Sequence, residues 1–104
     1  MRKQYKIQLL KRAVKDLDSI CEYLSLFTIN AAKNFLDRLE KVLDQLAAHP
    51  QMYPECELGR HYRKLVLGNH LVFYKVLSTD KTIKIYRILH AKRDTSIYWR
   101  SPQA

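Results

Sequence analysis

Clustered cations and aromatic side chains in residues 60–104 are the groups of this sequence best suited to chemistry. Residues 60–104 hold ten Lys or Arg and two Asp or Glu, whereas residues 1–59 hold nine and eight. Guanidinium and ammonium groups bind phosphates and carboxylates, and Trp, Tyr and Arg recur in binding hot spots. A net charge of +9 and a pI near 9.7 therefore predict an anionic partner, either nucleic acid or an acidic protein. The candidate binding residues are Arg63, Lys64, Arg87, His90, Lys92, Arg93, Tyr98 and Trp99.

Each of these groups also has a structural explanation. The cations of the predicted strands could instead be solvated or pair with an acidic segment of a partner protein. The two aromatic residues near the end could instead dock on the core. His90 ends a predicted strand, where a lone histidine is more often a satisfied structural group than a general base. Lys92 and Arg93 lie just past this strand, where they either bind the target or are a solvated pair of charges. The tyrosines of the basic strands suit nucleic-acid binding, although packing with their hydroxyls at the rim is the simpler explanation. These tyrosines are Tyr62, Tyr74 and Tyr86.

The composition argues against several other classes of protein. The four histidines and two cysteines lack metal-ligand spacing, so we expect no metal and no other cofactor. Cys21 and Cys56 are expected to be reduced thiols, as in a cytoplasmic protein. No apolar run approaches the roughly 20 residues that a membrane helix needs. We therefore expect a soluble, cytoplasmic, single-domain protein over residues 1–104.

Hydrophobic periodicity predicts the elements that position these groups. Residues 4–9 alternate as a short strand, and apolar residues then recur at three- and four-residue steps up to Phe27. The segment 28–30 is expected to break this helix and to supply capping side chains for a second helix that ends at Pro50. Three strands are predicted at residues 62–67, 71–77 and 82–89.

This order of elements predicts an α+β protein in which an N-terminal strand and a helical hairpin pack on a C-terminal antiparallel sheet. The turns of that sheet are expected at Gly68-Asn69 and at residues 78–81. By strict alternation Ile85 and Ile88 lie on opposite faces of the last strand, so both faces carry apolar groups. We therefore expect the helices to cover one face of the sheet and a partner to engage the other.

The element order β-α-α-β-β-β and two motifs resemble the ParE/RelE superfamily of toxins, and the ParE-like (plasmid stabilisation) branch in particular. The motifs are YRKLVLGNHLVFYKV at residues 62–76 and YRILHAKRD at residues 86–94, within a resemblance over residues 5–98. The resemblance implies a toxin of a type II toxin–antitoxin system. It also implies a cognate antitoxin as partner and a possible higher-order complex of the two proteins.

Two activities are implied by this resemblance. ParE-type toxins inhibit DNA gyrase and trap it with cut DNA, without catalysis of their own. RelE-type toxins are endonucleases that cleave messenger RNA on the ribosome. Under the second alternative the resemblance implies catalytic roles for Arg63, Lys64, Lys92, Arg93 and Tyr98. A binding module without either activity is a third possibility.

One departure from the RelE-type pattern favours gyrase inhibition. RelE-type toxins place an arginine three residues before the hairpin tyrosine, whereas this chain has Leu71 three residues before Tyr74. Strand alternation directs the adjacent His70 to the opposite face. Loss of one cation that stabilises a transition state typically raises the barrier by about 3 kcal/mol. The sequence therefore favours a gyrase inhibitor, with a ribosome-dependent endonuclease as the alternative.

Overall fold

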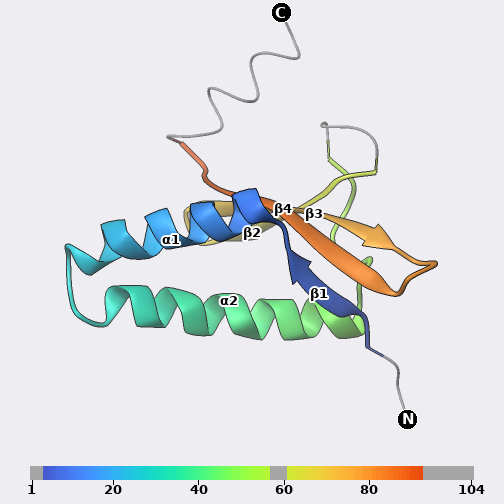
Figure 1. Cartoon of the computed structure of the whole chain (residues 1–104), viewed down its shortest axis with the longest axis horizontal. Coiled ribbons are helices and arrows are strands. Elements are labelled where there is room, and N and C mark those ends of the chain that lie inside the picture. Colours follow the sequence, from blue (N-terminus) through green and yellow to red (C-terminus); the bar gives the residue numbers. More distant parts are fainter. Residues whose placement is uncertain (1–3, 57–60, 93–104) are drawn as a thin grey trace, which may run out of the picture.

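A computed structural model describes residues 4–56 and 61–92 of the chain. The elements are β1 (Lys6–Leu9), α1 (Lys11–Ser25), α2 (Ala31–Ala48), β2 (Arg63–Leu67), β3 (His70–Leu77) and β4 (Thr82–His90). This order confirms the predicted β-α-α-β-β-β arrangement. The two helices lie antiparallel and side by side, as Figure 1 shows.

The four strands form one sheet in the order β1-β4-β3-β2. β3 pairs antiparallel with both β2 and β4, so the predicted C-terminal antiparallel sheet is confirmed. β1 joins its edge as a parallel strand, with Lys6 opposite Thr82 and Leu9 opposite Ile85. A parallel pair requires a long crossover, and the helical hairpin with the later strands provides it. The complete sheet is therefore mixed.

A β-bulge interrupts β4. Tyr74 lies opposite Ile85, whereas the preceding residue of β3 lies opposite Arg87, so Tyr86 is an extra residue. Strict alternation placed Ile88 on the face opposite to Ile85, and that prediction is wrong. The extra residue resets the alternation, so both isoleucines are buried in the same core.

The core lies between the helical hairpin and one face of the sheet. Its buried members are Ala13, Ile20, Phe35, Leu39, Leu46, Leu65, Val72, Tyr74, Ile83, Ile85 and Ile88. The predicted apolar stripes of both helices supply five of these residues, which confirms that the stripes share one surface. Other stripe residues stay open to solvent: Val14 is 42% exposed and Leu36 is 41% exposed.

The connection between the helices is apolar and exposed. Leu26, Phe27 and Ile29 are all exposed there. Asn30 precedes α2 with helical backbone angles, and its side chain makes no capping hydrogen bond. The predicted side-chain cap at this position is therefore wrong, because Asn30 already has the helical conformation that a capping residue avoids.

The turn between β2 and β3 lies against α2. Gly68 has φ of +60°, which L side chains rarely adopt, so the predicted tight turn is confirmed. A Cβ atom at this position would lie 3.4 Å from Nη1 of Arg38. Helix α2 therefore packs over the turn through an arginine side chain.

Candidate functional site

β2 divides two predicted site residues between the two faces of the sheet. Arg63 lies opposite Tyr74, a core residue, and Lys64 lies opposite Phe73. Successive side chains of a strand point to opposite faces. Arg63 therefore lies on the helix-covered side of the sheet, and Lys64 lies on the side away from the helices.

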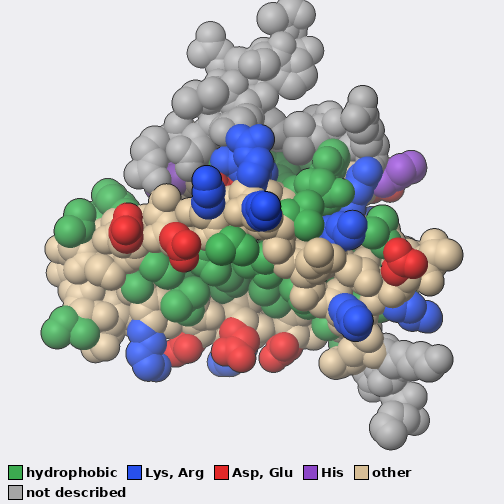
Figure 2. Space-filling view, viewed as in Figure 1, with side chains coloured by type: hydrophobic (Ala, Val, Ile, Leu, Met, Phe, Trp, Pro, Cys, Tyr) green, Lys and Arg blue, Asp and Glu red, His purple; other side chains and the backbone are tan. Residues whose placement is uncertain are grey.

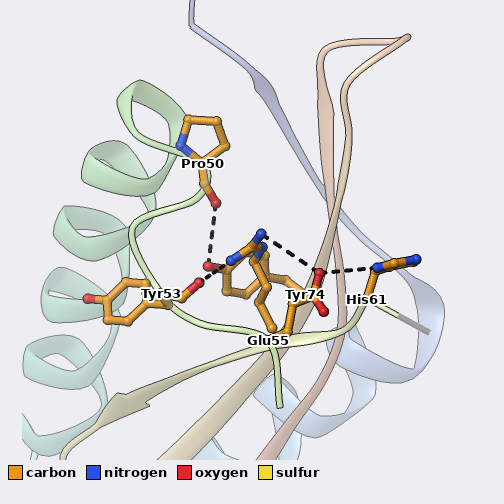
Figure 3. A network of polar contacts seen from close by, with 6 residues as sticks. Pro50, Tyr53, Glu55, His61 and Tyr74 are labelled. Atoms are coloured by element: carbon orange, nitrogen blue, oxygen red, sulfur yellow. Dashed lines mark hydrogen bonds and ion pairs between the residues drawn. The ribbon is translucent and has the colours of Figure 1, made fainter. Parts of the chain in front are cut away.

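Arg63 is held in a network that fastens the loop after α2 to the sheet, shown in Figure 3. Its guanidinium donates a hydrogen bond to the carbonyl oxygen of Tyr53 and lies 4.0 Å from a carboxylate oxygen of Glu55. The same carboxylate oxygen is 3.1 Å from Nδ1 of His61. Glu55 also forms an isolated backbone bridge with Arg63. The Arg63 side chain is only 18% exposed, so its interactions are structural.

Tyr74 completes this network from inside the core. Its hydroxyl donates a long hydrogen bond of 3.5 Å to the carbonyl oxygen of Pro50 (Figure 3). Burial raises the pKa of Tyr74 to about 12, although the nearby charge of Arg63 and the backbone of Tyr53 oppose the shift. The phenol therefore stays neutral at physiological pH and is no general base.

Arg87 is engaged by a carboxylate of α1. Its Nε and Nη2 donate to the two oxygens of Asp16 at 2.7 and 3.0 Å. The backbone N–H of Ile88 donates to the same carboxylate at 3.0 Å. β1 ends at Leu9, opposite Ile85, so within residues 4–56 and 61–92 the remainder of β4 has no strand partner on this edge. The carboxylate supplies the missing acceptor there.

The Asp16–Arg87 pair changes the prediction made for Arg87. With side chains 15% and 20% exposed, both partners are largely covered, and the guanidinium of Arg87 is engaged within the fold. Asp16 was not among the predicted site residues. The available signal was an acidic residue three positions after Ala13 and four before Ile20, at the border of the apolar stripe.

His90 is part of a small ring cluster at the end of the sheet. Its ring meets that of His70 edge-to-face at 5.3 Å, and the ring of His70 meets Phe35 in the same way at 5.0 Å. Nδ1 of His90 accepts a hydrogen bond from the backbone N–H of Lys92 at 3.2 Å. These contacts support the structural explanation of His90, while Lys92 itself is exposed.

The remaining predicted groups are distributed as follows. Arg93, Tyr98 and Trp99 lie outside the described residues. Cys21 and Cys56 are free thiols, and burial, followed by the charge of Asp18, raises the pKa of Cys21. Among the described residues no three His, Cys, Asp or Glu side chains are grouped to hold a metal ion. Neither helix of that part is long and apolar enough to cross a membrane.

The face of the sheet away from the helices brings Lys75 and Lys84, which were not among the predicted binding residues, together with the predicted Lys64, Tyr62 and Tyr86. Lys75 lies directly opposite Lys84, and Lys64 projects from the neighbouring strand on the same face. Nζ of Lys75 is 4.9 Å from the ring centre of Tyr62. The rings of Tyr62 and Tyr86 meet edge-to-face at 4.9 Å. We call these five residues the lysine face.

A helical hairpin on one side of a four-stranded sheet is the fold that this chain shares with a class of small toxins. The chain matches the family model described as "ParE toxin of type II toxin-antitoxin system, parDE" over residues 7–95, and it belongs to that family. It is 36% identical over 67 residues to Toxin ParE1 of Mycobacterium tuberculosis, covering 64% of this chain and 67% of that protein. It is 33% identical over 85 residues to Toxin ParE1 of Caulobacter vibrioides, covering 80% and 85%.

Solved structures share the fold at lower sequence identity. A chain of the chromosomal ParDE system from P. aeruginosa has a TM-score of 0.70 and 20% identity, covering 86% of this chain and 98% of that one. The isolated E. coli RelE toxin has a TM-score of 0.63 and 15% identity, covering 95% and 96%. The predicted superfamily and fold are thereby confirmed, and the chain is a toxin of a type II toxin–antitoxin system.

Proposed function

We propose that this toxin inhibits DNA gyrase in the cytoplasm and that a cognate antitoxin neutralises it. Its family and its curated relatives carry the ParE name, which supports gyrase as the target. The observation that carries the choice is the position of Arg63. This residue belongs to the implied RelE-type site, yet it lies on the helix-covered side of the sheet and contacts Tyr53 and Glu55.

Metal-free RNA cleavage requires several groups to converge on one phosphate. A base must act on the 2′-hydroxyl while cations stabilise the charge that develops. Arg63 and Lys64 lie on opposite faces of β2, so they do not converge. The place of the RelE-type arginine in β3 is taken by Leu71, which has no charge. A protein–protein mode of inhibition needs no such convergence.

The exposed apolar surface of the helices supports a partner protein. Figure 2 shows apolar side chains between α1 and α2, bordered by both acidic and basic side chains. Val14 and Leu36 contribute to the exposed apolar surface of these helices. Exposed apolar surface with a polar border is typical of a protein interface. We infer that the antitoxin covers it; solved structures that share this fold include a ParDE system and a RelBE toxin–antitoxin complex.

A gyrase assay tests the proposal directly. Purified toxin is added to gyrase and relaxed plasmid, and supercoiling and linear DNA are measured with and without ATP. We expect loss of supercoiling and accumulation of linear DNA, and both effects should vanish when the toxin is first incubated with its antitoxin.

A ribosome assay separates the alternative activity. The same toxin is added to a translation mixture, and message cleavage is mapped by primer extension. If gyrase is unaffected while messages are cut, and Lys64→Gln or Lys92→Gln abolishes the cuts, the endonuclease alternative is correct. If neither assay responds to folded toxin, both activities are excluded.

A further inference from the structure

The net charge of the described chain lies entirely in its strand-rich half. Residues 4–56 hold seven Lys or Arg and seven Asp or Glu, whereas residues 61–92 hold seven and one. Acidic and basic side chains accordingly mix over the helices, as Figure 2 shows. The cationic surface of the described residues therefore belongs to the sheet and its turns, and the lysine face, whose three lysines are each partly buried, is the part that lies away from the helices.

The lysine face contains a repulsive contact. Lys75 and Lys84 are directly opposite one another on adjacent strands, where like charges destabilise a sheet. None of the four strands carries an acidic residue, and within residues 4–56 and 61–92 neither lysine forms an ion pair. The ring of Tyr62 attracts the ammonium of Lys75 but does not neutralise it. A bound anion would supply the missing countercharge.

The spacing of the lysines fits a chain of phosphates. Cβ atoms of directly opposite residues are about 5 Å apart, and diagonal neighbours are about 7–8 Å apart. The row from Lys64 through Lys75 to Lys84 therefore spans about 12 Å across three strands. Successive phosphates of one DNA strand advance about 3.4 Å along the axis and also wind around it, so the three lysines of this row can contact at most about three phosphates.

The type of cation favours phosphates over the carboxylates of an acidic peptide. Bidentate recognition of carboxylates is characteristic of arginine, whereas lysine acts as a point charge. Both arginines of the described strands, Arg63 and Arg87, are engaged in contacts within the fold. The lysine face instead combines point charges with neighbouring tyrosines. Tyrosine hydroxyls commonly donate hydrogen bonds to the DNA backbone.

We propose that the lysine face binds the sugar–phosphate backbone of duplex DNA without regard to base sequence. The inference rests on the proposed function in one respect: the DNA concerned is the segment that gyrase holds and cuts. Binding of DNA to the face is measurable without gyrase.

The first experiment measures binding of a fluorescent 20-base-pair duplex to the purified toxin by anisotropy, between 50 and 200 mM KCl. Each lysine that neutralises a phosphate contributes about 0.9 to the slope of log affinity against log salt concentration. The Lys75→Gln/Lys84→Gln protein is expected to lose about 1.8 of this slope and about tenfold or more in affinity. Lys15→Gln/Lys41→Gln removes the same charge from the exposed surface of the helices and is expected to keep the wild-type slope.

Three outcomes would overturn the inference. Equal losses in both double variants would show that net charge alone controls binding. An unchanged slope after substitution of Lys75 and Lys84 would exclude their contact with phosphates. If the Lys75→Gln/Lys84→Gln protein no longer binds a poly-glutamate peptide but keeps its affinity for DNA, the face would be assigned to an acidic protein. Urea unfolding serves as the folding control, and removal of the repulsion should leave the midpoint unchanged or higher.

The second experiment separates this inference from the proposed function. Wild-type toxin and both double variants are compared in the gyrase–plasmid assay. Both proposals are supported if wild-type toxin inhibits gyrase and only the Lys75→Gln/Lys84→Gln protein loses inhibition, by at least about fivefold. Equal inhibition by all three proteins overturns the DNA contact and leaves gyrase as the target. No inhibition by wild type, with the salt slope behaving as expected, overturns gyrase as the target while the DNA contact stands.

Discussion

The Asp16 carboxylate is expected to contribute strongly to the free energy of unfolding. It pairs with the guanidinium of Arg87 and also accepts a hydrogen bond from the backbone N–H of Ile88 at the edge of β4. Asp16→Ala removes two hydrogen bonds from Arg87 and one from the backbone of Ile88. Removing one partner of a buried ion pair typically costs 3–5 kcal/mol. With side chains 15% and 20% exposed, solvent compensates part of that loss. We therefore expect about 3 kcal/mol, the lower end of that range.

This loss would be a large fraction of the stability of a small domain, which is about 5–15 kcal/mol. Asp16→Asn keeps one acceptor oxygen but loses the charge, and we expect it to cost about half as much. Urea unfolding followed by circular dichroism gives these values directly. A loss of about 3 kcal/mol should also lower Tm by roughly 12 °C or more.

Two comparisons make the Asp16 prediction specific. Asp18→Ala removes an exposed carboxylate from the same helix and is expected to change stability by less than about 0.5 kcal/mol. The cycle of Asp16→Ala with Arg87→Met should give a coupling energy of about 2 kcal/mol between the two side chains. Equal effects of the Asp16 and Asp18 substitutions, or a coupling energy near zero, would refute the assigned role of this pair.

Three further predictions follow from buried or strained positions. The folded-state pKa of Tyr74 lies near 12, whereas its ordinary value is 10. The contribution of the neutral phenol to the free energy of unfolding is therefore complete below pH 10 and is lost as pH rises towards 12. Urea unfolding at pH 8 and pH 11 should therefore show a smaller alkaline loss in Tyr74→Phe than in wild type, by about 1–2 kcal/mol, and equal losses would contradict this. Gly68→Ala should cost about 1–2 kcal/mol by thermal unfolding because of its positive φ, and Gly68→Asn should cost less, since asparagine tolerates that conformation; the reverse order would exclude backbone strain as the cause. In a Cys56→Ser protein, the Cys21 thiol should react with a disulfide reagent at pH 8 more slowly than free cysteine, because its raised pKa lowers the thiolate fraction; a rate equal to that of free cysteine would disprove the shift.

Much of the fold was predictable because its signals are local. The change from a period of two to a period of 3.6 after residue 9 marks the end of β1 and the start of α1. Gly68 marks the β2–β3 turn because few other residues adopt its backbone angles. Breaks in pattern of this kind depend only on neighbouring residues, so they are visible in the sequence.

The candidate site was less predictable, because its geometry depends on distant pairings. The contacts of Arg63 and Arg87 within the fold were not predictable, because their partners Tyr53 and Asp16 lie ten and 71 positions away in the chain. The lysine face depends on the register of β3 with β4, which places Lys75 opposite Lys84.

The sequence by itself determined the family, the order of helices and strands, and the concentration of positive charge after residue 60. These properties follow from composition, periodicity and short motifs, none of which needs a three-dimensional partner. Only the tertiary structure decided which cations are engaged by other groups within the fold and which lie on the sheet face away from the helices. The physical reason is that a β-bulge and a strand register set the direction of each side chain, and both arise from hydrogen bonds between segments far apart in the chain.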